Sequence, residues 1–172
     1  SQKGAWGLRS WIEHAIASNR PYNSFVHEIL TANGSTFQNP PSSYLRVLRN
    51  PDDAVENTTQ LFLGIRFSCN KCHDHPFERW TQNQYYELAS YFARVGRKPG
   101  VDDQEEVIYE QESGEVVHPK TGSAVTPSFP YAHAGEVPVE GTRREQLAAW
   151  ITSPQNPYFA TTFVNRMWSY LM

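Results

Sequence analysis

Cys69 and Cys72 are the only two cysteines of this 172-residue chain, and His73 directly follows the second. In a Cys-x-x-Cys-His segment the thiols are spaced to form thioether bonds with one haem, and the adjacent imidazole can bind its iron as an axial ligand. Because the segment uses every cysteine of the chain, a chance match of the kind found in cysteine-rich sequences is a poor explanation. The segment therefore predicts one covalently attached haem c, held by Cys69, Cys72 and His73.

Other chemistry stays open on these residues alone. His75 adds a fourth zinc-binding side chain, although structural zinc sites take their ligand pairs from two separated segments and no second pair follows here. A thioredoxin-like redox pair is expected in a βαβ setting, whereas the pattern around Cys69 and Cys72 is helical. A structural disulfide requires none of the flanking residues. The corresponding alternative function is an interaction domain stapled by zinc or by a disulfide, without haem.

The sixth coordination position of a haem iron distinguishes two further functions. A second His or Met makes a closed electron-transfer site, whereas an open position admits peroxide, oxygen or other small ligands and indicates a peroxidase-like or gas-sensing domain. The candidate ligands are Met167, which equally fits the apolar face of a helix, and His118 and His133, which equally fit exposed loop positions. The sequence does not choose among these three residues and an open iron.

Three residues close to the motif belong to the predicted haem environment. Phe77 and Trp80 either wall the haem edge or form part of the ordinary core. His75 either contacts a haem propionate or forms hydrogen bonds within its loop, because it lies too close to His73 to reach the opposite face of the same haem.

Helices must position this motif, because apolar side chains recur at helical spacing on both sides of it. Asn50 followed by Pro51 is typical of a helix start, and the helix that begins there leads into Cys69. Capping boxes open two later helices at Thr81 and Thr142. The predicted helices lie within residues 6–19, 19–34, 50–65, 81–95, 142–154 and 156–171.

Residues 96–141 interrupt the helical pattern with Gly, Pro and acidic residues. We predict a long irregular loop there, with one short β-hairpin that turns at Ser113 and Gly114. The expected fold is mostly α, a cytochrome c-like helical haem domain. Its three parts are a haem-attachment region over 1–95, a loop and hairpin insertion over 96–141, and C-terminal helices over 142–172 that pack on the haem domain.

The charge pattern excludes some partners. The formal net charge is −3 with both signs interspersed, which gives no electrostatic basis for binding nucleic acid or an anionic membrane. No run is long and apolar enough for a membrane span. The chain begins without Met or a signal-peptide pattern and stops within an apolar segment, so we expect a piece of a longer protein, and a homodimer through its C-terminal helix is one expectation.

The stretch "LFLGIRFSCNKCHDHPFERWTQNQYYELASYFARV" closely resembles the haem-motif region of the planctomycete cytochrome C family, in the second of its two domain types, long catalogued as a domain of unknown function. The upstream stretch "RPYNSFVHEILTANGS" is similar to the same domain. Downstream, "TRREQLAAWITSPQNPYFATTFVNRMW" resembles the opening of the planctomycete-specific domain that follows it in the same large proteins.

This resemblance implies that Cys69 and Cys72 hold haem covalently and that His73 is an axial ligand. It also implies a parent protein of the large, exported, multidomain redox type, with redox donor and acceptor not established. Covalent haem c is assembled outside the bacterial cytoplasmic membrane, so we expect a periplasmic or otherwise exported location. The expected function is single-electron transfer by a mono-haem domain, rather than catalysis by the domain itself.

Overall fold

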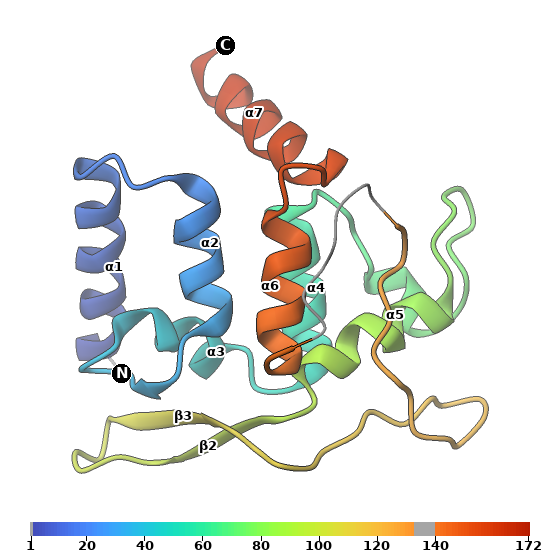
Figure 1. Ribbon diagram of the computed structural model, residues 1–172, viewed down its shortest axis with the longest axis horizontal. Helices are drawn as coiled ribbons and strands as arrows, with labels where there is room; N and C mark the ends of the chain where they lie inside the picture. The colour runs from blue at the N-terminus through green and yellow to red at the C-terminus, as the bar shows by residue number, and fades with distance from the viewer. Residues whose placement is uncertain (1, 133–139) are drawn as a thin grey trace.

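The computed structural model describes residues 2–132 and 140–172. Helices predominate in these residues, as predicted, and a three-stranded antiparallel sheet of order β1-β3-β2 lies along one edge (Figure 1). The helices are α1 (Gln2–Ala17), α2 (Tyr22–Thr31), α3 (Ser43–Val47), α4 (Pro51–Phe62), α5 (Gln82–Ala89), α6 (Arg143–Thr152) and α7 (Pro157–Leu171). The strands are β1 (Gly34–Ser35), β2 (Val95–Pro99) and β3 (Glu106–Glu110), and short 3-10 turns are η1 (Pro40–Ser42), η2 (Ser68–Lys71) and η3 (Ser90–Phe92).

Three helices begin at the capping residues that the sequence predicts. The Asn50 side chain accepts a hydrogen bond from the backbone N–H of Asp53 at 2.8 Å, which satisfies one free donor of the first turn of α4. Thr81 and Thr142 each form both hydrogen bonds of a capping box, at the starts of α5 and α6. Local sequence therefore sets where the helices on either side of the motif begin.

The core lies between α2, α4, α5 and α6. Its apolar side chains include Val26, Leu30, Val55, Leu88, Leu147 and Trp150. Arg144 is buried among them with 1% of its surface exposed, donates hydrogen bonds to the backbone carbonyls of Leu30 and Ala32, and pairs with Glu110 at 3.0 Å. This one guanidinium therefore ties α6 to the end of α2 and to β3.

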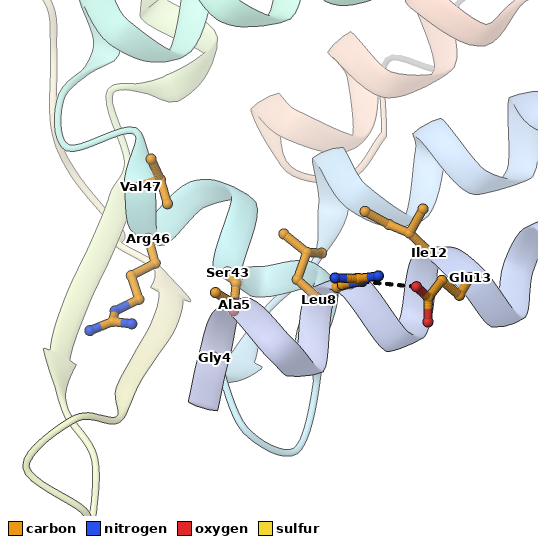
Figure 2. Close-up of a pocket in the computed structure, with 9 residues that line it drawn as sticks. Gly4, Ala5, Leu8, Ile12, Glu13, Ser43, Arg46 and Val47 are labelled. Atoms are coloured by element: carbon orange, nitrogen blue, oxygen red, sulfur yellow. Dashed lines mark hydrogen bonds and ion pairs between the residues drawn. The ribbon is translucent and has the colours of Figure 1, made fainter. Parts of the chain in front are cut away.

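The first and last helices are less enclosed. Helix α1 lies beside α2, and α7 extends away from the rest of the molecule (Figure 1). A groove between α1 and α3 is lined by apolar side chains such as Leu8 and Ile12 (Figure 2), and also by Arg9 and Glu13, which form an ion pair. The groove contains no residue of the Cys-x-x-Cys-His motif.

The hairpin is real but lies elsewhere than predicted. We expected the strand at 106–110 to turn back at Ser113–Gly114, and this was wrong, because β3 pairs antiparallel with the preceding strand β2. The connecting turn is held by the Glu105 carboxylate, which accepts hydrogen bonds from the backbone N–H groups of Val101 and Asp102. These local hydrogen bonds favour a turn at 100–105 over the later Gly position.

The helix that starts after Thr81 is shorter than predicted. It was expected to reach Val95, but α5 ends at Ala89 and Val95 is the first residue of β2. Pairing with β3 there overrides the helical spacing of the apolar residues, as tertiary context commonly does. The structure also contains α3, which is too short for hydrophobic periodicity to indicate.

Candidate functional site

Helix α4 delivers the chain to the motif. The helix ends at Phe62, and Gly64 adopts a left-handed conformation with φ of 67°, which a residue with a side chain would adopt only with strain. Phe67 is then buried against Trp80, with ring centroids 5.4 Å apart, and marks the start of the motif. The motif is therefore anchored in the core on its N-terminal side.

The motif itself forms a tight surface turn. The backbone N–H groups of Cys72 and His73 both donate to the carbonyl oxygen of Cys69, at 3.3 and 3.4 Å. Both thiols are exposed and unpaired, while Asn70 between them is fully buried. The turn thus presents both Cys69 and Cys72 at the surface of the protein.

His73 has the tautomer that a metal ligand needs. Its Nδ1 lies 2.7 Å from the backbone carbonyl oxygen of Asp74, and since a carbonyl can only accept, Nδ1 carries the proton. The lone pair of the neutral imidazole is then on Nε2, on an exposed side chain. Orientation of a ligating histidine through Nδ1–H and a backbone carbonyl is common at metal centres.

Three buried side chains hold the turn from beneath. Asn70 Nδ2 donates to the carbonyl oxygen of Trp80 at 2.6 Å. Gln82 Nε2 and the Tyr86 hydroxyl both donate to the carbonyl oxygen of Lys71, at 3.0 and 2.9 Å. The sequence alone does not indicate these three residues as supports of the motif. The capping box "TQNQ" places Gln82 in the first turn of α5, but only the fold brings that turn under Lys71.

Charge around the turn is partly neutralised. The Lys71 ammonium pairs with Asp52 at 2.9 Å, and this hydrogen bond raises the pKa of Lys71 above its ordinary value. Burial, and then the charge of Asp52, raise the pKa of the Tyr86 hydroxyl, while Lys71 opposes this. Tyr86 is therefore a neutral hydrogen-bond donor at physiological pH.

His75 holds the loop that follows the motif. Its Nδ1 accepts hydrogen bonds from the backbone N–H groups of Phe77 and Glu78, at 3.2 and 2.9 Å, and the backbone N–H of His75 donates to the Trp80 carbonyl at 2.9 Å. These bonds agree with the second interpretation of His75, a residue that orders its own loop.

Phe77 and Trp80 occupy opposite environments. Phe77 is 93% exposed, whereas Trp80 is 3% exposed and packs near Tyr131 and Tyr158. The Arg79 guanidinium lies over the Trp80 ring at 4.5 Å from its centroid. Trp80 is thus a core residue beneath the motif loop, and Phe77 is an apolar side chain presented on its surface.

The proposed sixth ligands are separated by the structure. His118 is buried and packs edge-on against Tyr86, with ring centroids 5.1 Å apart, so it lies close to the motif. Met167 instead lines a pocket with residues of α1 and α2, among them Tyr22 and Phe25, and none of the motif. His133 lies outside the described residues.

The side chains that a zinc site would need do not lie together in the structure. Within residues 2–132 and 140–172, no three His, Cys, Asp or Glu side chains converge so as to hold a metal ion. Two unpaired thiols beside an imidazole with a free Nε2 lone pair do fit the chemistry of haem c. In the same described ranges, every helix falls short of the length and apolarity that crossing a membrane requires.

The structure thus defines a mostly helical domain that presents a Cys-x-x-Cys-His turn on its surface. Residues 1–97 match the family described as PSCyt2, Protein of unknown function (DUF1549), and residues 143–172 match PSD1, Protein of unknown function (DUF1553). The first match covers more than half of the chain, so the protein belongs to the PSCyt2 family, and the predicted resemblance to a planctomycete cytochrome C domain followed by the next domain is confirmed. No curated protein and no solved structure matches the chain.

Proposed function

We propose that this domain carries one haem c, attached through Cys69 and Cys72, and that it transfers single electrons. The observation that carries the proposal is the combination of two exposed, unpaired thiols with a His73 whose Nε2 lone pair is free. The PSCyt2 family name supports it, although the family description assigns no function.

Each motif residue has a role in this proposal. Cys69 and Cys72 would hold the haem through thioether bonds, and His73 would bind its iron through Nε2, with the ring oriented by the Asp74 carbonyl. A haem held there would supply a reversible one-electron iron couple. The hydrogen bonds from Asn70, Gln82 and Tyr86 keep the turn in one conformation, which limits structural change on electron transfer.

The loop after the motif completes the environment. His75 fixes the backbone at Phe77, so that this exposed ring is available to cover an apolar surface laid over the turn. Trp80 supports the turn from the core side. We therefore assign three residues to the haem environment: Phe77 as a cover, Trp80 as a support from the core, and His75 as the residue that orders the loop.

The position of the site favours exchange with other proteins or domains. Because the thiols and His73 lie at the surface, a group attached to them keeps an edge accessible to a redox donor or acceptor. Attachment of haem c takes place outside the bacterial cytoplasmic membrane, so the proposal includes a periplasmic or otherwise exported location. An open sixth position would turn the same site toward peroxide or gas binding.

The proposal is tested with protein matured by a haem-attachment system. Haem should remain with the polypeptide after acid–acetone extraction in wild type and in the neighbouring control Ser68→Ala. It should be extracted from the double variant Cys69→Ala/Cys72→Ala. The reduced-minus-oxidised spectrum should be low-spin and indifferent to carbon monoxide. A high-spin spectrum that shifts with carbon monoxide would replace electron transfer by ligand binding, and extractable haem in wild type would contradict covalent attachment.

A further inference from the structure

His118 is a buried histidine close to the motif. Only 6% of its surface is exposed, although it lies in the irregular segment between β3 and α6. The segment makes a compact turn at His118. The backbone N–H of His118 donates to the Ser123 carbonyl at 2.9 Å, and the backbone N–H of Gly122 donates to the His118 carbonyl at 2.8 Å. Hydrogen bonds to both the backbone N–H and the backbone carbonyl of His118 therefore fix the position from which its imidazole extends.

The hydrogen bonds of the ring define its tautomer. The backbone N–H of Lys120 donates to His118 Nδ1 at 3.2 Å, so Nδ1 presents its lone pair and the neutral ring carries its proton on Nε2. Nε2 is buried and has no acceptor among the described residues. A buried donor without an acceptor costs free energy, and such a group in a native protein calls for a partner.

Tyr86 connects this donor to the motif. The rings of Tyr86 and His118 pack in an edge-type arrangement with centroids 5.1 Å apart, and the Tyr86 hydroxyl donates to the backbone carbonyl of Lys71, which lies between the two cysteines. Contacts with Tyr86, a residue of α5, thus link the His118 ring to the turn that carries Cys69 and Cys72.

We propose that His118 donates a hydrogen bond from Nε2 to a haem propionate, and that it is not the sixth ligand of the iron. This inference rests on the proposed function. His73 and His118 have opposite tautomers: the first donates through Nδ1 and keeps a lone pair on Nε2, and the second accepts at Nδ1 and has a proton on Nε2. A lone pair is what iron requires, and an N–H is what a carboxylate requires.

His118 is in this account a positioning residue. A donor at a propionate draws negative charge away from the iron, and its loss leaves more of that charge to stabilise the ferric state. Removal of the donor should therefore lower the midpoint potential without changing the axial ligands. The same hydrogen bond should contribute to stability only when the cofactor is attached.

The experiment compares His118→Leu, His118→Gln and the control His14→Leu in haem-loaded protein. Gln places an amide N–H close to the position of Nε2, and His14 is exposed on α1. We expect a lower midpoint potential for His118→Leu, recovery toward the wild-type value for His118→Gln, and no change for His14→Leu. The low-spin spectrum should be the same in all of them.

A second measurement separates this role from simple packing. Thermal unfolding of His118→Leu should occur at a lower temperature than wild type in haem-loaded protein, and at the same or a higher temperature in protein made without haem. An equal loss of thermal stability in both forms, or an unchanged midpoint potential, would overturn the inference. The partner of His118 Nε2 would then be sought in bound water. Conversion to a high-spin spectrum would also overturn it, by identifying His118 as an iron ligand. Absence of covalent haem in wild type would instead reject the proposed function.

Discussion

The Asn70 side chain and the Trp80 carbonyl are joined by a buried hydrogen bond of 2.6 Å, which closes the motif turn onto the end of the loop that follows it. Asn70 lies between the two cysteines and is fully buried, whereas its neighbours are exposed. The geometry of the thiols therefore depends on an amide that the motif pattern itself treats as a variable position.

Asn70→Ala should destabilise the protein by about 1–3 kcal/mol, because it leaves a buried acceptor with one partner fewer. Urea unfolding followed by circular dichroism measures the loss. Asn57→Ala is the matched control, since the Asn57 side chain donates to a backbone carbonyl at 2.9 Å on an exposed helix face, and it should cost much less. Equal losses for the two variants would contradict a special role for Asn70.

His75→Ala should loosen the loop without releasing haem. The variant removes the acceptor of two backbone N–H groups, each worth about 0.5–1.5 kcal/mol, so the amides of Phe77 and Glu78 should exchange faster with deuterium. His75→Asn, which keeps an acceptor near the position of Nδ1, should restore part of the protection. A changed axial-ligand spectrum in His75→Ala would contradict a role of His75 that is confined to the loop.

Arg144→Met should be strongly destabilising, by about 3–5 kcal/mol, because it strands the partners of a buried guanidinium, including Glu110. Arg9→Met, which removes an exposed i,i+4 pair with Glu13, should cost at most about 0.5 kcal/mol. Chemical denaturation of both variants tests the contrast. A small loss at Arg144 would mean that α6 is not held to α2 in the way the structure shows.

Acid should weaken the contact between Glu115 and Arg143. Hydrogen bonds from Arg143 hold the pKa of the Glu115 carboxyl below its ordinary value, with burial opposing and Arg94 adding to the effect. Because the folded pKa is the lower one, the contribution is complete above the unfolded pKa of about 4.3 and is lost as the pH falls through the folded pKa.

Glu115→Gln should therefore lose less stability than wild type on acidification, with a difference below about 1 kcal/mol because the pair is partly exposed. Thermal unfolding at a series of pH values from neutral to acid measures it. Parallel pH profiles for the two proteins would show that Glu115 is not the group responsible.

Helix starts and the motif were predictable because their causes are local. Asn50, Thr81 and Thr142 cap helices with side chains a few residues from the groups they satisfy, and the spacing of Cys69, Cys72 and His73 needs no fold to be recognised. The same applies to the family, whose motif block is contiguous in the sequence.

Features that depend on distant partners were not predictable. The sequence between Val95 and Glu110 gives no sign of which neighbour β3 will pair with, and the tautomer of His118 depends on a turn that only the folded chain forms. Burial of His118 against Tyr86 likewise joins two residues far apart in the chain. Met167 and His118 were equivalent as candidate ligands until the fold separated them.

Intact mass spectrometry of protein matured by a haem-attachment system is the most direct test of the central claim. We expect the denatured wild-type chain to carry the added mass of one haem, and Cys69→Ala/Cys72→Ala to carry none. A wild-type mass equal to that of the bare polypeptide under these conditions would contradict it.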